Sequence, residues 1–124
     1  VRFMRTITKK YIVTEEMTAS KYASGTLEVF GTPGLVACME DTAKTLVEED
    51  LKEGESSVGT KVGTTHLKAT KVGQTVTVEA TLVKQEGRMY DFVIKAYEDG
   101  VLIGEGEHTR AVINVERFLA KLNK

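Results

Sequence analysis

The chain has 124 residues, 41% of them hydrophobic and 28% charged, which is typical of one globular domain, and we expect a single domain over residues 1–124. Seventeen basic against eighteen acidic residues leave a net charge of −1, which gives no electrostatic reason to expect nucleic acid or an anionic membrane as partner. No apolar run approaches the length of a membrane span, and residues 1–10 lack the pattern of a signal peptide. The single cysteine, Cys38, cannot form an internal disulfide, so we expect a packed thiol in the reducing cytoplasm.

The first third of the chain leads from a strand into a helix. Alternating apolar residues predict a strand over residues 6–14. Residues 15–28 have no sustained period, so we expect a loop there, of the kind that forms lids over sites.

The stretch over residues 31–53 predicts the only long helix in the middle of the chain. Thr32 can cap it, Pro33 suits the first helical position, and Gly54 is a stop signal. At 100° per residue, six apolar residues gather on one stripe: Leu35, Val36, Met39, Ala43, Leu46 and Val47. This stripe needs a partner surface to bury it.

From residue 58 onward the chain is rich in strand-forming residues. We expect strands over residues 58–69, 75–85, 89–98 and 101–115, with Asp99-Gly100 as a strong hairpin signal. Because short turns join neighbouring strands, these strands should form an antiparallel meander. Residues 115–124 have apolar residues at helical spacing and predict a last short helix.

The order is therefore strand, helix and four further strands. One helix with one apolar stripe and an antiparallel sheet with one apolar face can bury each other. The fold class predicted is α+β, with about five antiparallel strands wrapped around one long central helix, the hot-dog arrangement.

Few residues are candidates for chemistry. His66 and His108 lie far apart without a cysteine pair beside them, and the sequence has no phosphate-binding glycine loop and no Gly-x-Ser-x-Gly, so we expect no metal and no redox cofactor. Glu40 lies at the edge of the apolar stripe, where it is either a marginal residue that reaches water or a functional acid with a perturbed pKa. Taken alone, a histidine in a strand such as His66 is more often structural than catalytic.

The combination of residues favours acyl transfer to water. Thr32 lies at the positive end of the helix dipole, where the N–H groups of residues 31–34 can polarise a carbonyl oxygen. Glu40 and His66 can activate water or move a proton. As a cap, Thr32 also has a purely structural interpretation.

Three segments carry a resemblance to a known family: EVFGTPGLVACMEDTA, SVGTKVGTTHLKATKVGQTVTVEATL and GEGEHTRAVINVERF. In this order they resemble the fluoroacetyl-CoA thioesterase-type hot-dog proteins, over residues 6 to about 118. The resemblance implies a homodimer with the acyl-CoA site at the subunit interface. It implies catalytic roles for Thr32, Glu40 and His66.

The same resemblance assigns two further residues. It implies that Gly59 lines the acyl pocket and that Arg110 lies near the coenzyme, although Arg110 taken alone is equally an ordinary strand-end charge. The family's fluoroacetyl enzyme has bulky aromatic residues before the threonine, whereas residues 22–27 here are mostly small. We therefore expect thioesterase chemistry without selectivity for a fluorinated acyl group.

Three functional hypotheses remain open from the sequence. The first is hydrolysis of a small acyl-CoA, with either Thr32 or water as the nucleophile. The second is a non-catalytic acyl-CoA-binding or sensing module. The third is hot-dog dehydratase or isomerase chemistry, in which a histidine and an acid also act on acyl-CoA.

Overall fold

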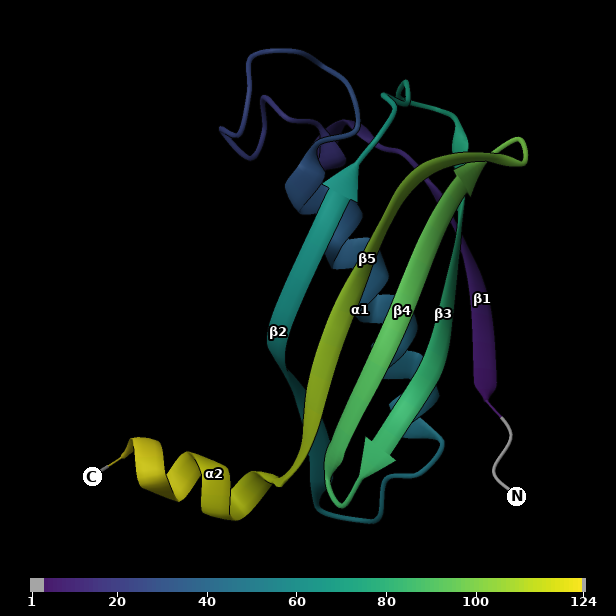
Figure 1. Ribbon diagram of the computed structural model, residues 1–124. Coiled ribbons are helices and arrows are strands. Elements are labelled where there is room, and N and C mark those ends of the chain that lie inside the picture. The colour runs from purple at the N-terminus through teal and green to yellow at the C-terminus, as the bar shows by residue number, and fades with distance from the viewer. Residues whose placement is uncertain (1–3, 124) are drawn as a thin grey trace.

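A computed structural model describes residues 4–123 of the chain (Figure 1). Its elements, in chain order, are β1 (Arg5–Ile12), the short 3-10 helix η1 (Glu15–Met17), α1 (Thr32–Glu48), β2 (Glu55–His66), β3 (Thr75–Glu86), β4 (Met89–Glu98), β5 (Val101–Asn114) and α2 (Val115–Leu122). Among the described residues, no helix is both long and apolar enough to cross a membrane.

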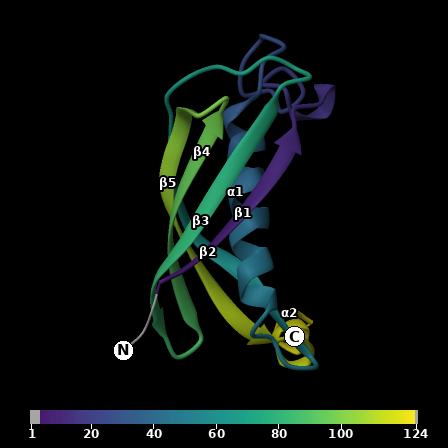
Figure 2. The ribbon, with the colours of Figure 1, turned by 90° about the vertical axis from the view of Figure 1, so that its right-hand side faces the viewer.

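The five strands form one antiparallel sheet in the order β1-β3-β4-β5-β2. The sheet curves around α1, which runs along its concave face (Figures 1 and 2). The predicted hot-dog arrangement is therefore confirmed. The meander is shorter than expected, because β2 pairs with β5 rather than with β3 and residues 67–74 cross the end of the sheet. This topology makes β1 and β2 the two edge strands.

The core lies between the sheet and α1. Alternate residues of the central strands point inward and are buried, as strand geometry requires. The helix contributes the predicted apolar stripe, except that Val36 is only partly buried. The largest fully buried apolar side chains are Phe30, Leu35, Met39, Leu46, Phe92, Ile94 and Ile103.

The start of α1 differs from the sequence prediction. Gly31 is the N-cap and Thr32 is the first helical residue, with Pro33 behind it in the first turn. No side chain caps the helix, and the carbonyl of Gly31 accepts the first helical hydrogen bond, from the N–H of Leu35. The helix also ends earlier than predicted, at Glu48, followed by a turn. The hydroxyl of Thr32 is thus released from capping and available for another contact.

The ends of the sheet follow simple turn chemistry. Asp99 (φ 49°) and Gly100 (φ 76°) both adopt positive φ, as a two-residue hairpin turn with the right twist requires. β2 begins and ends three residues earlier than predicted, so that His66 is its last residue.

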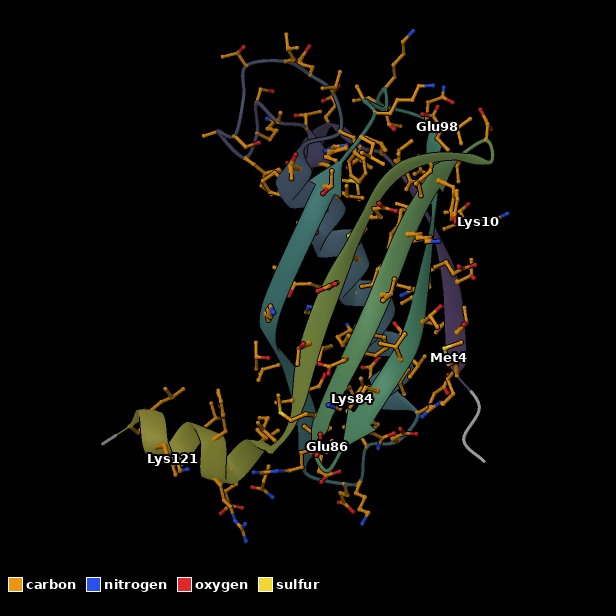
Figure 3. All side chains as sticks on the ribbon, viewed as in Figure 1. Met4, Lys10, Lys84, Glu86, Glu98 and Lys121 are labelled. Atoms are coloured by element: carbon orange, nitrogen blue, oxygen red, sulfur yellow. The ribbon has the colours of Figure 1, made fainter. Side chains whose placement is uncertain are left out.

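At the opposite end of the molecule, α2 leaves β5 and projects away from the sheet (Figure 1). The charged Lys84 and Glu86 mark the nearby β3–β4 turn in Figure 3.

Candidate functional site

Thr32 and His66 meet where the start of α1 faces the end of β2. The Thr32 Oγ1 and His66 Nδ1 atoms are 2.9 Å apart, within hydrogen-bond distance. An activated hydroxyl needs a base at this separation. The structure therefore brings together two of the three residues that the sequence analysis selected for catalysis.

This pair lines a pocket of about 300 Å³ between the loop before α1 and the segment after β2. One wall is Phe30, which is buried and lies edge-on to the His66 ring, with the ring centroids 6.1 Å apart and the planes at 78°. The sequence analysis missed Phe30. Its position just before the N-cap was the available signal, since an apolar residue there folds back onto the first helical turns. A Cβ at Gly34 would lie only 3.1 Å from the Phe30 ring, so that glycine makes room for it.

The environment of His66 favours a neutral imidazole. Burial lowers the pKa of His66 below its ordinary value of 6.5, and an interaction with the backbone of Lys68 opposes this in part. Within the described chain, the buried Nε2 atom makes no hydrogen bond of good geometry. A neutral imidazole beside a hydroxyl can accept that hydroxyl's proton.

The helix start offers fewer donors than predicted. Of residues 31–34, Gly31 already donates its N–H to the carbonyl of Met17, and Pro33 has no N–H. The N–H groups of Thr32 and Gly34 are left as candidates for binding a carbonyl oxygen.

Glu40 belongs to a second cluster, in the middle of α1. Its Oε2 atom lies 4.0 Å from Nη1 of Arg110, whose residue is only 6% exposed. The guanidinium donates to Oγ and the carbonyl oxygen of Ser57, both at 3.0 Å, and contacts Nε2 of His108 at 3.2 Å. Arg110 is therefore an interior residue of β5 rather than a solvated charge at the strand end.

His108 connects this cluster to β2, and the sequence analysis gave it no role. Its Nδ1 atom lies 2.8 Å from the carbonyl oxygen of Lys61. A carbonyl can only accept and a guanidinium can only donate, so Nδ1 carries the proton and Nε2 accepts from Arg110. Burial, with the Arg110 charge acting in the same direction, lowers the pKa of His108 and keeps the ring neutral.

Gly59 shapes the opening of the second cluster. A Cβ at this position would lie 2.8 Å from Oε2 of Glu40 and 3.0 Å from the His108 ring. The missing side chain leaves a pocket of about 220 Å³, which Glu40 and His108 also line. Gly59 therefore lines a pocket beside Glu40, and its expected role in holding the acyl group stays a prediction.

The two clusters are separate within one chain. Eight residues of helix place Glu40 roughly 12 Å beyond Thr32 along α1. Along β2, His66 lies roughly 23 Å from Gly59, because a strand rises about 3.3 Å per residue. The structure therefore pairs Thr32 with His66, and Glu40 with Gly59 and Arg110. Over residues 4–123, no group of histidine, cysteine and acidic residues is arranged to hold a metal ion.

The match to known proteins covers most of the chain. The family model of the fluoroacetyl-CoA-specific thioesterase FlK matches residues 13–116. A fluoroacetyl-CoA thioesterase from Streptantibioticus cattleyicolor is 41% identical over 97 residues, which cover 78% of this chain and 70% of that protein. The chain belongs to the fluoroacetyl-CoA-specific thioesterase family. The family resemblance predicted from the three sequence segments is confirmed.

Solved structures agree with this membership. A crystal structure of an FlK variant in complex with fluoroacetate and CoA is 34% identical, with a TM-score of 0.88 over 95% of this chain and 99% of that chain. A hot-dog-like protein from Thermanaerovibrio acidaminovorans is 24% identical, with a TM-score of 0.83 over 97% of this chain and 87% of that chain, and it supports the fold alone.

Proposed function

We propose that this member of the fluoroacetyl-CoA-specific thioesterase family hydrolyses a small acyl-CoA to the free acid and coenzyme A. The observation that carries the proposal is the Thr32–His66 hydrogen bond inside an open pocket at the start of α1. In the family relatives, FlK is named as a fluoroacetyl-CoA thioesterase and a variant of it has been crystallised with CoA. No metal or redox cofactor takes part in the proposed reaction.

We propose that the complete site needs two copies of the chain. β2 is an edge strand, so one side of its backbone has no partner strand in the described chain, and such an edge is a template for pairing. Antiparallel pairing of two β2 strands about a centre between Val62 and Gly63 sets His66 of one copy opposite Gly59 of the other. Glu40 of the second copy then approaches the Thr32–His66 pair of the first.

The proposed chemistry follows from these positions. The thioester carbonyl lies at the start of α1, where the N–H groups of Thr32 and Gly34 and the helix dipole stabilise the developing oxyanion. His66 accepts a proton from the attacking oxygen, and Glu40 of the second copy stabilises the imidazolium or holds the water. The acyl carbon–sulfur bond breaks, the acyl group gains the oxygen of water, and the proton goes to the thiolate of coenzyme A. The attacking oxygen belongs either to Thr32 or to water.

The remaining predicted site residues receive specific roles. Gly59 leaves space for the acyl group beside Glu40, since any Cβ would occupy it. Because the donors of Arg110 are bonded inside the protein, we propose that Arg110 fixes Glu40 and the acyl side of the pocket rather than reaching a coenzyme phosphate. Cys38 has no part in the reaction, since burial raises the pKa of its thiol to about 11. Its buried, unpaired state supports a cytoplasmic location.

The loop before the helix bears on the choice of acyl group. The loop over residues 22–27 is exposed throughout, and Tyr22 is its one aromatic residue. Of this loop, only Ser24 lines the pocket. We therefore propose a short acyl chain without selectivity for fluorine.

Release of free thiol from a panel of short acyl-CoAs, followed with a colorimetric thiol reagent, tests the proposal. We expect turnover with the parent protein and almost none with His66→Ala. Coenzyme A binding by calorimetry without release from any acyl-CoA would instead make the protein a binding module. Sedimentation equilibrium tests the dimer independently, and a monomer at micromolar concentration would contradict the two-copy site.

A further inference from the structure

The C-terminal helix α2 has an apolar face that is only partly covered in the described chain. Its apolar residues recur at helical spacing, and four residues share one stripe: Val115, Phe118, Leu119 and Leu122. Phe118 is 37% exposed, Leu119 49% and Leu122 68%. The other positions of the helix include charged residues, among them Lys121, which Figure 3 labels. Such an apolar face usually marks an interaction surface.

The position of α2 indicates where its partner lies. The helix starts beside the first residues of β2, because the N–H of Val115 donates to the carbonyl of Gly54. From there it runs out past the unpaired β2 edge (Figure 1). Eight helical residues extend roughly 12 Å, whereas strands are spaced about 4.8 Å apart. The apolar face of α2 can therefore extend at most two to three strand widths beyond this edge.

The β2 register of the proposed dimer determines what α2 meets. With the centre between Val62 and Gly63, the paired stretch ends where Gly59 of one copy lies opposite His66 of the other. Residues 54–58 and α2 of the first copy then extend beyond the end of the partner's β2, where the partner's residues 67–74 cross the end of the sheet. Residues 67–69 form one side of the Thr32–His66 pocket. The segment is bonded to the loop before α1, since the N–H of Phe30 donates to the carbonyl of Thr70. Two exposed apolar side chains lie in these two segments: Leu67, 52% exposed, and Leu27, 67% exposed.

We propose that α2 of each copy packs on the rim of the partner's pocket and closes its mouth. The inference rests on the proposed dimer and adds a specificity-determining element to it. Phe118, Leu119 and Leu122 meet Leu67 and Leu27 of the second copy, so that two exposed apolar surfaces bury each other. The C-terminal helix thereby limits the acyl-CoA pocket in trans.

Covalent capture tests the contact directly. Leu67→Cys and Leu122→Cys are placed in the same chain and treated with a short bis-maleimide, while the native Cys38 is buried and unreactive. The two positions lie at opposite ends of β2, roughly 36 Å apart within one chain, so any link must join two chains. We expect a covalent dimer, and none from the control pair Val93→Cys and Leu122→Cys, because Val93 lies on the outer sheet face.

A kinetic arm measures what the contact does. Phe118→Ala with Leu122→Ala should raise KM for acyl-CoA about tenfold and change kcat less, because the helix limits the pocket without touching the reacting atoms. The matched control is Val83→Ala with Val93→Ala, two exposed valines of the outer sheet face.

The outcomes separate this inference from the proposed function. A dimeric, active protein that gives no Leu67–Leu122 link, or an unchanged KM in the α2 variant, overturns the role of α2 and leaves the thioesterase proposal standing. A helix that binds another protein or a lipid surface would give this result. A monomer by sedimentation overturns the dimer, and the role of α2 with it. If the protein is a dimer and forms the Leu67–Leu122 link but releases no thiol, the contact of α2 is supported and the proposed thioesterase activity is contradicted.

Discussion

The two sides of α1 are built differently. On the side facing β1, polar groups are bonded to each other within the chain. Asp41 accepts hydrogen bonds from Nζ of Lys9 and from the hydroxyl of Tyr11, both at 2.7 Å. The Tyr11 hydroxyl also lies 2.8 Å from that of Thr42. These contacts hold the helix to the edge of the sheet.

On the side facing β2, the polar groups retain capacity for further partners. Thr32 is exposed and contacts His66 by a single hydrogen bond. The Glu40 side chain is 40% exposed, and its closest ion-pair distance, to Arg110, is 4.0 Å. We infer that the β1 side serves stability, whereas the β2 side serves a reaction that requires a second copy and a substrate. Substitutions on the two sides should therefore change different quantities.

The largest expected effect is on turnover at the β2 side. His66→Ala or Glu40→Gln should each lower kcat by roughly 10²–10⁴, the range usual for general acid–base groups. If the two residues act as one unit, the double variant should be little worse than the poorer single one. Steady-state thiol release measures this, with Glu48→Gln, farther along the same helix, as the control. Near-normal turnover of Glu40→Gln with a lowered thermal midpoint would show that Glu40 is structural.

Arg110→Ala should have the next largest effect. It is the exception on the β2 side, because the donors of Arg110 are bonded inside the protein and their loss should lower stability. The substitution leaves Oγ and the carbonyl of Ser57 and Nε2 of His108 without their donor inside the protein. Unsatisfied buried groups and the cavity should together cost about 2–4 kcal/mol in the free energy of unfolding. Chemical denaturation measures the loss, and the exposed Arg117→Ala is the control. A change confined to KM that high salt abolishes would instead indicate an arginine bound to a coenzyme phosphate.

Periodicity was enough to predict most of the fold. The apolar stripe of residues 35–47 and the alternation in residues 75–85 are local patterns, and local patterns specify which faces must be buried. The turn at Asp99-Gly100 was equally readable, because few residues tolerate positive φ. The pairing of β2 with β5 could not be predicted, since no local pattern indicates which strand β2 pairs with.

The candidate site was predicted only in part. The resemblance gave Thr32 a catalytic role, but its predicted place as the helix cap was wrong, because spacing cannot distinguish a cap from the residue after it. Its contact with His66, 34 residues away, cannot be inferred from a local pattern. From the sequence alone, Arg110 could be an ordinary surface charge, because its partners Ser57 and His108 are known only from the structure. In the proposed dimer, the position of Glu40 relative to His66 depends on the second copy, which one chain's pattern does not describe.

A lysine at the β2 edge should weaken the proposed dimer. Val62→Lys introduces two like charges near the proposed centre of the β2–β2 pairing, where they repel each other. We expect the dissociation constant of the dimer, measured by sedimentation equilibrium, to rise by about tenfold or more. Turnover per chain should fall as the dimer dissociates. Val83→Lys is the matched control, because Val83 is a similarly exposed strand valine away from this edge. An unchanged dimer with Val62→Lys would place the interface elsewhere.

The pH dependence should reflect a neutral histidine on the β2 side. Since burial lowers the pKa of His66 below 6.5, the active neutral base persists at pH values where an ordinary histidine is half protonated. The acid limb of kcat/KM should therefore have its midpoint below pH 6.5. Stability should also fall toward acid pH. The pKa values of His66 and His108 are lower in the folded state than in the unfolded chain, so the unfolded chain binds protons at a higher pH. The free energy of unfolding should therefore fall as the pH drops below 6.5. A midpoint at or above 6.5 would contradict a buried base.

The smallest expected effect is on the β1 side. Hydrogen bonding from Lys9, the largest cause, lowers the pKa of Asp41 to about 2. The ionised carboxylate therefore stabilises the folded state at pH values above 3.8, the ordinary carboxyl pKa. This stabilisation is lost as the pH falls through about 2. Lys9 and Asp41 are each about a third exposed, so solvent screens the pair and Asp41→Asn should cost only about 0.5–1 kcal/mol at neutral pH. The parent and the variant should converge near pH 2, while kcat per folded chain stays unchanged at pH 7. Denaturation at both pH values and thiol release at pH 7 measure these quantities. A loss of kcat without a loss of stability would mean that the β1 side also takes part in the reaction, and that the division between the two sides of α1 is wrong.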